Sequence, residues 1–338
     1  MKNLGLSLVV LLSTQVFASN KVIYGDDDRL DVFEETNFKL SDLAKSTAAM
    51  IPNSKITELN NEQIILKGDS LQARGMCASE RFSEQPTVAN CSGFLVGEDK
   101  LVTAGHCVEG EFDCKNNSWV FDYKVDHATQ SEVVVDKSSV YKCKKVIKQE
   151  LNSANEMDYA LIELEKVVED RKFLKVRKEG KPQVGDKLVV IGHPSGLPTK
   201  ITAGAKVRSV NDVFLVADLD TYGGNSGSAV FNASTGTVEG ILVRGAQDYT
   251  WDSDQGCRVS NVIAQDEGRG EDVTLITNIA ELASYPEPQE DQVDEDEDQD
   301  DGSVDDGSAD DSDDQVEEPK PEDPKPSLPW WLRWLLGL

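Results

Sequence analysis

Between Cys77 and Pro286 the chain is a series of short apolar runs, and this pattern limits its fold more than any other feature. Gly, Asn, Asp and Pro, which favour turns, separate one run from the next. Many short strands with turn signals between them are typical of an all-β sandwich or barrel. The runs are Gly93-Phe94-Leu95-Val96, Ser118-Trp119-Val120-Phe121, Ala160-Leu161-Ile162, Lys187-Leu188-Val189-Val190-Ile191, Val213-Phe214-Leu215-Val216, Ala229-Val230-Phe231 and Gly240-Ile241-Leu242-Val243.

Three further segments complete the expected secondary structure. Thr36–Met50 is read as a helix and Gln63–Leu66 as a strand. Val273–Tyr285 has apolar residues at helical spacing. We therefore expect a C-terminal helix to close the domain.

The charge of the chain is strongly negative and unevenly distributed. The formal net charge is −28. From Pro286 to Leu338 there are 20 acidic and three basic residues, a net of −17, which leaves −11 for the rest of the chain. A surface this negative repels phosphate, so nucleic acid is not expected as a partner.

The acidic residues concentrate in a low-complexity segment, Glu287–Pro326, that contains almost nothing to bury. Like charges repel, so we expect a disordered linker. Asp296, Asp298 and Asp300 resemble the start of a calcium loop, but the Gly and the closing Glu of such a loop are missing.

The last segment, Leu328–Leu338, holds three of the five tryptophans and ends in leucines. It is too short to span a bilayer, and Trp favours the membrane interface. We therefore expect an interfacial anchor or a sorting tag that associates the protein with the cell surface. Docking on a protein surface is the alternative.

The first 18 residues have the pattern of a signal peptide. Lys2 supplies a positive charge, and Leu4–Phe17 is mostly apolar but short for a membrane span. Val16-Phe17-Ala18 predicts cleavage before Ser19, with an N-terminal membrane anchor as the alternative. An exported chain reaches an oxidising compartment, where six cysteines indicate three disulfides. We expect a secreted or periplasmic protein.

Two short motifs carry the chemistry. Thr103-Ala104-Gly105-His106-Cys107 follows a strand-like run, and Gly223-Gly224-Asn225-Ser226-Gly227-Ser228 lies between two later runs. Asp158 opens an apolar run between the motifs. A serine hydroxyl is a poor nucleophile near neutral pH unless a neighbouring base accepts its proton. We predict Ser226 as nucleophile, His106 as that base and Asp158 as the group that orients the imidazole.

The glycines around Ser226 allow a tight loop whose backbone N–H groups, those of Gly224 and Ser226, can point at an oxyanion. The loop lacks the Lys and the helix pattern of a phosphate-binding P-loop. No His/Cys cluster has zinc-ligand spacing, so we expect no metal and no cofactor. We expect His127 on the surface and His193 in a structural turn.

The two motifs resemble the His and Ser boxes of the trypsin-like serine peptidases, and the order His, Asp, Ser is that of chymotrypsin. Gly223–Ser228 and the acidic tail resemble more closely the bacterial branch that includes the glutamyl endopeptidases. Val22–Arg29 resembles the start of mature enzymes in that branch. The resemblance covers about residues 22–284. It implies an all-β, chymotrypsin-like fold of two six-stranded antiparallel barrels.

The resemblance also bears on the disulfides. In trypsin-like enzymes a disulfide with the spacing of Cys91 and Cys107 clamps the catalytic-His loop, which implies that pair here. The other four cysteines allow three connectivities. We favour Cys114–Cys143, and Cys77–Cys257 as the pair that remains.

Activation and specificity follow from the same resemblance. Asn225 stands where trypsin has the Asp that pairs with its new N-terminus, so trypsin-style zymogen switching is not expected. Processing after Lys21 would start the mature chain at Val22, as in the glutamyl-endopeptidase branch.

Four residues are predicted to bind substrate. Asp220 aligns with the pocket aspartate of trypsin and favours Lys or Arg before the cut. Thr221 aligns with a Thr of the glutamyl endopeptidases, but Leu242 replaces their pocket His. Arg244 either attracts acidic residues or pairs with Asp220. We lean towards basic residues before the cut.

The sequence therefore predicts a secreted serine endopeptidase, a monomer acting on proteins or peptides. The expected order is signal peptide 1–18, propeptide and N-terminal segment 19–75, peptidase domain 76–285, acidic linker 286–327 and Trp/Leu-rich end 328–338. Two alternatives stay open: a peptidase-like binding protein without turnover, and an acidic cation-binding surface protein.

Overall fold

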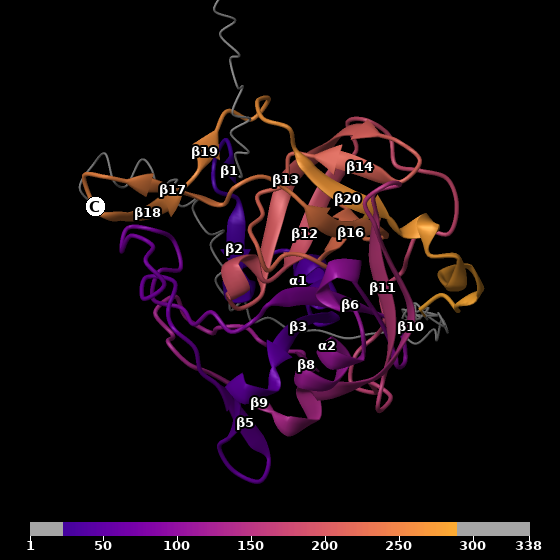
Figure 1. Ribbon diagram of the computed structural model, residues 1–338, viewed down its shortest axis with the longest axis horizontal. Helices are drawn as coiled ribbons and strands as arrows, with labels where there is room; N and C mark the ends of the chain where they lie inside the picture. The colour runs from indigo at the N-terminus through magenta and orange to yellow at the C-terminus, as the bar shows by residue number, and fades with distance from the viewer. Residues whose placement is uncertain (1–22, 289–338) are drawn as a thin grey trace, which may run out of the picture. The chain divides into compact units, whose positions relative to one another are not determined.

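The structure, a computed structural model, describes residues 23–288 (Figure 1). Six strands of the N-terminal half close into a barrel in the order β10-β11-β7-β6-β3-β8, and all neighbours in it are antiparallel. The strands are β3 (Thr47–Pro52), β6 (Cys91–Gly97), β7 (Lys100–Thr103), β8 (Asn117–Val120), β10 (Val140–Asn152) and β11 (Met157–Leu164).

A second barrel follows in the chain. Its order is β12-β15-β16-β20-β14-β13, a β12–β13 pairing closes it, and β2 extends it from β13, again with antiparallel neighbours. The predicted fold of two six-stranded antiparallel barrels is confirmed. The strands are β2 (Arg29–Asp31), β12 (Lys187–Gly192), β13 (Lys200–Val210), β14 (Phe214–Ala217), β15 (Ala229–Asn232), β16 (Val238–Arg244) and β20 (Glu271–Leu275).

Each of the seven apolar runs falls on a strand of the two barrels, because its side chains pack into a barrel interior. Phe94, Trp119 and Leu161 of the first barrel are buried in the same apolar cluster as Phe231 and Ile241 of the second. Burial of such side chains is the main driving force for folding. A shared cluster of this kind holds the two barrels together.

The predicted helix over Thr36–Met50 is only partly right. Helix α1 spans Phe38–Ala44, and β3 begins at Thr47. Ala48 and Ile51 are fully buried in the first barrel. Strand pairing and burial therefore decide the structure of the second part of this segment. A second short helix, α2 (Glu111–Asn116), was not predicted.

The predicted C-terminal helix over Val273–Tyr285 is replaced by a strand and two 3-10 turns. Val273 and Thr274 belong to β20, where β-branched side chains pack well between β14 and β16. The 3-10 turns Ile276–Asn278 and Ala280–Ser284 follow.

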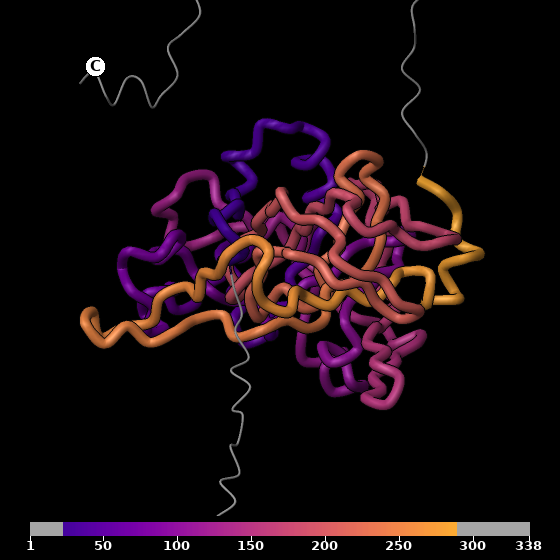
Figure 2. The backbone as a smooth tube through the Cα atoms, turned by 90° about the horizontal axis from the view of Figure 1, so that it is seen from above, coloured from indigo at the N-terminus to yellow at the C-terminus, as the bar shows by residue number. Residues whose placement is uncertain are grey.

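Three small sheets surround the barrels, and the β17–β18 hairpin extends outward in both views (Figures 1 and 2). The predicted strand Gln63–Leu66 is present as β5. The sheets are the parallel pair β1 (Ile23–Tyr24) and β19 (Val262–Ile263), the hairpin β17 (Tyr249–Asp252) and β18 (Cys257–Ser260), and the sheet of β4 (Ile56–Glu58), β5 (Gln63–Leu66) and β9 (Val133–Asp136).

All six cysteines form disulfides, in the pairs expected from the sequence. Cys91–Cys107 joins β6 to the turn after β7, and Cys114–Cys143 joins α2 to β10. Cys77–Cys257 joins a loop of the N-terminal half to β18. Three disulfides suggest an extracellular or periplasmic protein.

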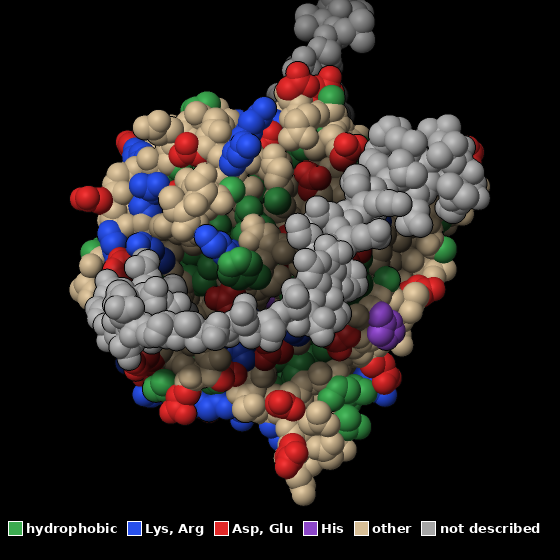
Figure 3. All heavy atoms as spheres, turned by 180° about the vertical axis from the view of Figure 1, so that it is seen from behind, with side chains coloured by type: hydrophobic (Ala, Val, Ile, Leu, Met, Phe, Trp, Pro, Cys, Tyr) green, Lys and Arg blue, Asp and Glu red, His purple; other side chains and the backbone are tan. Residues whose placement is uncertain are grey.

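Several predictions concern residues that the structure does not describe. The signal peptide 1–18, its cleavage before Ser19, the start at Val22, nearly all of the acidic linker 286–327, and Leu328–Leu338 lie outside residues 23–288. Within the described residues, 23–288, no helix is long and apolar enough to cross a bilayer. On the face seen in Figure 3, acidic and basic side chains are interspersed.

Candidate active site

His106 and Asp158 meet at one end of two neighbouring strands of the first barrel, β7 and β11. His106 lies in a 3-10 turn directly after β7, and Asp158 lies at the start of β11, which pairs with β7. Asp158 Oδ2 is 2.8 Å from His106 Nδ1, and Oδ1 accepts a hydrogen bond from the His106 backbone N–H at 3.1 Å. Asp158 is 2% exposed, whereas the His106 side chain is 34% exposed. The carboxylate thus fixes the imidazole through Nδ1 and leaves Nε2 for another partner.

Ser226 comes to this pair from the second barrel. The backbone N–H of Ser92 donates to the Ser226 carbonyl at 2.8 Å, and this carbonyl lies 3.7 Å from Cys107 Sγ, next to His106 in the chain. The Ser226 hydroxyl itself forms no hydrogen bond with any residue in 23–288. The structure brings the loop of Ser226 against the turn of His106.

Two glycines make the loop around Ser226 possible. Gly224 has φ +97° and Gly227 has φ +88°, values that side chains disfavour. A Cβ on Gly224 would collide with the His193 carbonyl, and one on Gly227 would collide with the Ser92 carbonyl. The loop therefore packs tightly against both neighbouring segments.

Two backbone N–H groups of the loop are left available. Asn225 N–H donates to Tyr222 at 2.9 Å, and Gly227 N–H donates to Leu242 at 2.8 Å. The N–H groups of Gly224 and Ser226, the two predicted oxyanion donors, donate to no acceptor in the described part of the chain. A pair of uncommitted amides beside a serine can stabilise a developing negative charge.

Asp220 is engaged by the N-terminal segment. Its Oδ1 accepts from the Tyr24 backbone N–H at 2.7 Å, and its Oδ2 accepts from the Asp28 N–H at 3.1 Å. Asp220 is 4% exposed, and burial raises the pKa of its carboxyl to about 7. The residue thus links the strand β1 region to the segment that leads to Ser226.

Of the other predicted substrate-binding residues, Leu242 and Arg244 lie on β16, and Thr221 directly follows Asp220. Leu242 is buried in β16. Arg244 donates to Asp272 at 3.1 Å, so its ion-pair partner is Asp272 and not Asp220. Thr221 Oγ1 donates to Glu271 Oε2 at 2.9 Å.

Glu271 is a residue that sequence reasoning missed. It is 1% exposed in β20, and besides Thr221 it accepts from the Ala246 N–H at 3.4 Å, just beyond β16. No motif surrounds Glu271 in the sequence. Only the pairing of β16 with β20 brings its carboxylate between the loop of Ser226 and the end of β16.

His193 is structural and His127 is exposed. His193 is fully buried, its Nδ1 lies 3.2 Å from the Leu197 carbonyl, and its ring stacks on Tyr123. Burial lowers the pKa of His193 to about 3, so the ring stays neutral.

One potential metal-ligand group occurs in the described residues, and its chemistry argues against metal binding. Cys91, His106 and Cys107 place their ligand atoms within 4.8 Å of one another. The two sulfurs form a disulfide, so neither is a thiolate that can bind a metal.

Several solved structures of proteases are similar to the chain. A Glu endopeptidase in complex with MPD is 14% identical, with 77% of this chain and 97% of that chain covered and a TM-score of 0.46. The VesB protease of Vibrio cholerae is also 14% identical, with 77% and 66% covered and a TM-score of 0.45. The active form of the Rv3671c protease from M. tuberculosis is 13% identical, with 86% and 95% covered and a TM-score of 0.41. At these scores the fold assignment rests on the strand pairing described above.

Comparison with curated protein sequences finds no match. Residues 91–241 match the family model described as a trypsin-like peptidase domain. This range contains His106, Asp158 and Ser226, and it spans parts of both barrels. Residues 91–241 are therefore similar to the trypsin-like peptidase domain family.

Proposed function

We propose that the protein is an exported serine endopeptidase with Ser226 as nucleophile, His106 as general base and Asp158 as the orienting carboxylate. The observation that carries the proposal is the double contact of Asp158 with His106, through the ring and through the backbone, at 2.8 and 3.1 Å. Two uncommitted amides in the adjoining loop of Ser226 add to it. This arrangement supports acyl transfer.

The proposed reaction uses these residues in turn. Ser226 Oγ attacks the carbonyl carbon of the scissile bond, and His106 Nε2 accepts the hydroxyl proton. The N–H groups of Gly224 and Ser226 stabilise the oxyanion. The C–N bond then breaks, and His106 gives its proton to the leaving amine. Water attacks the remaining Ser226 ester in the same way and releases the acid.

Covalent labelling tests this proposal. A fluorophosphonate probe is expected to label the folded, secreted full chain at Ser226, because the activated Oγ displaces fluoride from phosphorus while His106 takes the proton. Intact-mass and peptide mass spectrometry locate the adduct. Ser226→Ala should not label. Ser228→Ala is the matched control and should label, because the Ser228 hydroxyl lies buried in the same loop and is not the group that the probe reaches. A folded wild-type chain that does not label would point instead to a binding protein without turnover.

We further propose that Lys or Arg precedes the cut. Thr221 lies five residues before Ser226 in the chain, and its hydroxyl contacts the buried carboxylate of Glu271. Buried carboxylates favour a cationic partner.

Mass spectrometry of a digested proteome measures this preference. Lys and Arg before the cut should be enriched at least about 10-fold over neutral residues, because a neutral side chain lacks one charge contact with the carboxylate. Glu271→Gln should weaken the enrichment yet still label with the probe. A strict preference for Glu would overturn the assignment of basic specificity.

A further inference from the structure

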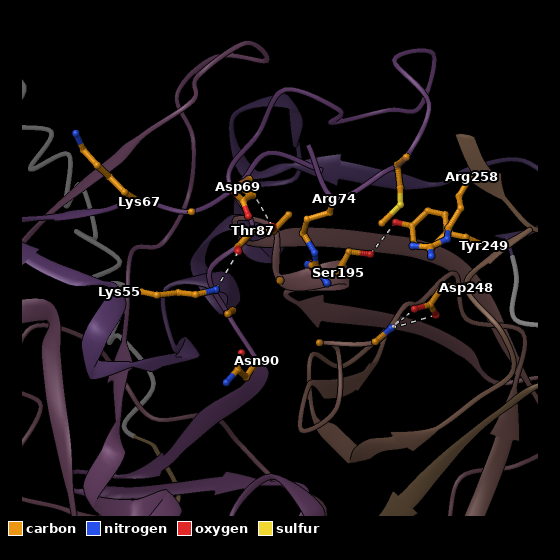
Figure 4. Close-up of a pocket in the computed structure, with 16 residues that line it drawn as sticks. Lys55, Lys67, Asp69, Arg74, Thr87, Asn90, Ser195, Asp248, Tyr249 and Arg258 are labelled. Carbon is orange, nitrogen blue, oxygen red and sulfur yellow. Dashed lines mark hydrogen bonds between the residues drawn. The ribbon is translucent and has the colours of Figure 1, made fainter. Parts of the chain in front are cut away.

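A cavity of about 930 Å³ opens beside the loop that carries Ser226 (Figure 4). Gly223 and Gly224 form one part of its wall, and Asn90, which precedes Cys91, forms another. The disulfide Cys77–Cys257 joins the two chain segments that supply much of the remainder. The charged residues of the lining are Lys55, Lys67, Asp69, Arg74, Asp248 and Arg258.

Cations outnumber carboxylates in this lining by four to two. Lys67 pairs with Glu132 at 2.8 Å. Lys55, Arg74 and Arg258 form no ion pair with a carboxylate within residues 23–288. In a chain with a net charge of −28, three such cations around one cavity make a local positive site.

The contacts of these cations are with neutral groups. Arg74 donates to the Ser195 carbonyl at 2.8 Å, and Lys55 Nζ donates to the Thr87 carbonyl at 3.4 Å (Figure 4). Burial, and then the charge of Arg74, lower the pKa of Lys55, while Asp69 opposes them. An anion in the cavity would relieve this repulsion.

The two carboxylates of the lining, Asp69 and Asp248, do not supply this anion. Asp248 accepts from the Gly223 backbone N–H at 2.9 and 3.1 Å, so it braces the loop before Ser226. Asp69 lies close enough to Lys55 to affect its pKa but forms no ion pair with it in the described chain.

The cavity lies at the end of the site where the leaving group departs. His106 gives its proton to the leaving amine, so the residues after the cut must pass His106. The Cys91–Cys107 disulfide adjoins His106, and Asn90 continues from Cys91 into the cavity wall. The wall of Thr221, Glu271 and Ala246 is a separate set of residues, none of which lines the cavity.

We propose that this cavity binds the side chain of an acidic residue, Asp or Glu, among the first three residues after the scissile bond. The proposal rests on the proposed peptidase function and narrows its substrates to sites with acidic residues after the cut. Lys55, Arg74 and Arg258 supply the positive charge. An extended peptide advances about 3.3 Å per residue, so three residues cover about 10 Å beyond the bond.

Matched internally quenched peptides test the proposal with the full chain. They share a sequence that the enzyme cuts and differ by Glu or Gln at each of the first three positions after the bond. At the favoured position Glu should raise kcat/KM about 10-fold over Gln, because two or more partly exposed charge contacts add. The preference should shrink between about 50 and 300 mM NaCl as the charges are screened.

A double variant, Lys55→Gln with Arg258→Gln, locates the effect. It should cut the Gln peptide as wild type does but lose most of the preference for Glu. Lys39→Gln is the matched control, since Lys39 is exposed on α1 and does not line the cavity. A peptidyl coumarin amide, which has no residue after the cut, should be hydrolysed equally by all three proteins.

The outcomes separate the two proposals. Equal kcat/KM for Glu and Gln peptides at every position, or a Glu preference that persists in the double variant, overturns the acidic subsite. Hydrolysis of the coumarin amide in that case leaves the peptidase assignment intact. Loss of coumarin hydrolysis and of probe labelling in wild type would instead reject the peptidase itself.

Discussion

Replacing Asp158 with Asn is expected to lower kcat for a peptide substrate by about 10⁴-fold. Asp158 Oδ2 lies 2.8 Å from His106 Nδ1 and fixes the proton on that nitrogen, which leaves Nε2 free to accept the proton of Ser226. An amide can present an N–H to the ring and favour the other tautomer, and in serine peptidases this change costs about 10⁴ in kcat. The variant should fold, because the Asn oxygen can still accept from the His106 backbone N–H.

Initial rates with a quenched peptide, at saturating substrate, measure this effect. Asp136→Asn is the control, since Asp136 is an exposed aspartate at the end of β9. It should change kcat less than about twofold, as surface substitutions usually do. If Asp158→Asn keeps more than a tenth of the wild-type kcat, the role assigned to Asp158 is wrong.

The contribution of Asp220 to the stability of the domain is expected to fall as the pH rises from about 4 to about 7. Burial raises the pKa of Asp220 from 3.8 to about 7. Between these values the folded state binds more protons than the unfolded state, so stability is full below the lower value and is lost as the pH rises through the upper one. One such group contributes at most about 1.4 kcal/mol per pH unit.

Urea denaturation of wild type and Asp220→Asn across about pH 3 to 9 measures this contribution. The substituted side chain carries no charge at any pH. The free energy of unfolding of the variant, relative to wild type, should therefore rise between about pH 4 and pH 7 and stay level above pH 7. A constant offset is expected as well, because the Asn side chain offers only one acceptor oxygen to the N–H groups of Tyr24 and Asp28. Parallel curves for the two proteins would contradict the raised pKa.

The buried carboxylates of Asp220 and Glu271 have neighbours that the sequence did not predict. Alignment with trypsin placed Asp220 in the specificity pocket, but its oxygens accept from the N-terminal segment. Glu271, which no motif marked, lies against Thr221 because β20 pairs with β16. Strand register sets the neighbours of a side chain. No local sequence pattern determines the register between strands that are far apart in the chain.

The cationic cavity has the same origin. Lys55 and Arg258 are more than 200 residues apart, and each looks like an ordinary surface cation in the sequence. Arg258 lies on β18, which Cys77–Cys257 joins to the loop that holds Arg74, and Lys55 lines the same cavity from the turn between β3 and β4. Their lack of ion-pair partners within residues 23–288 is visible only once the fold is known.

The sequence alone determined the strand-rich architecture and the residues proposed for the chemistry. Period and turn residues mark strands locally, and the motifs of His106 and Ser226 keep each residue beside the backbone that holds it. The tertiary structure decided the ends of helix α1, the strand at Val273, and which charged residues line the cavity. These depend on burial and pairing between segments far apart in the chain, where the free energy of packing exceeds local propensity.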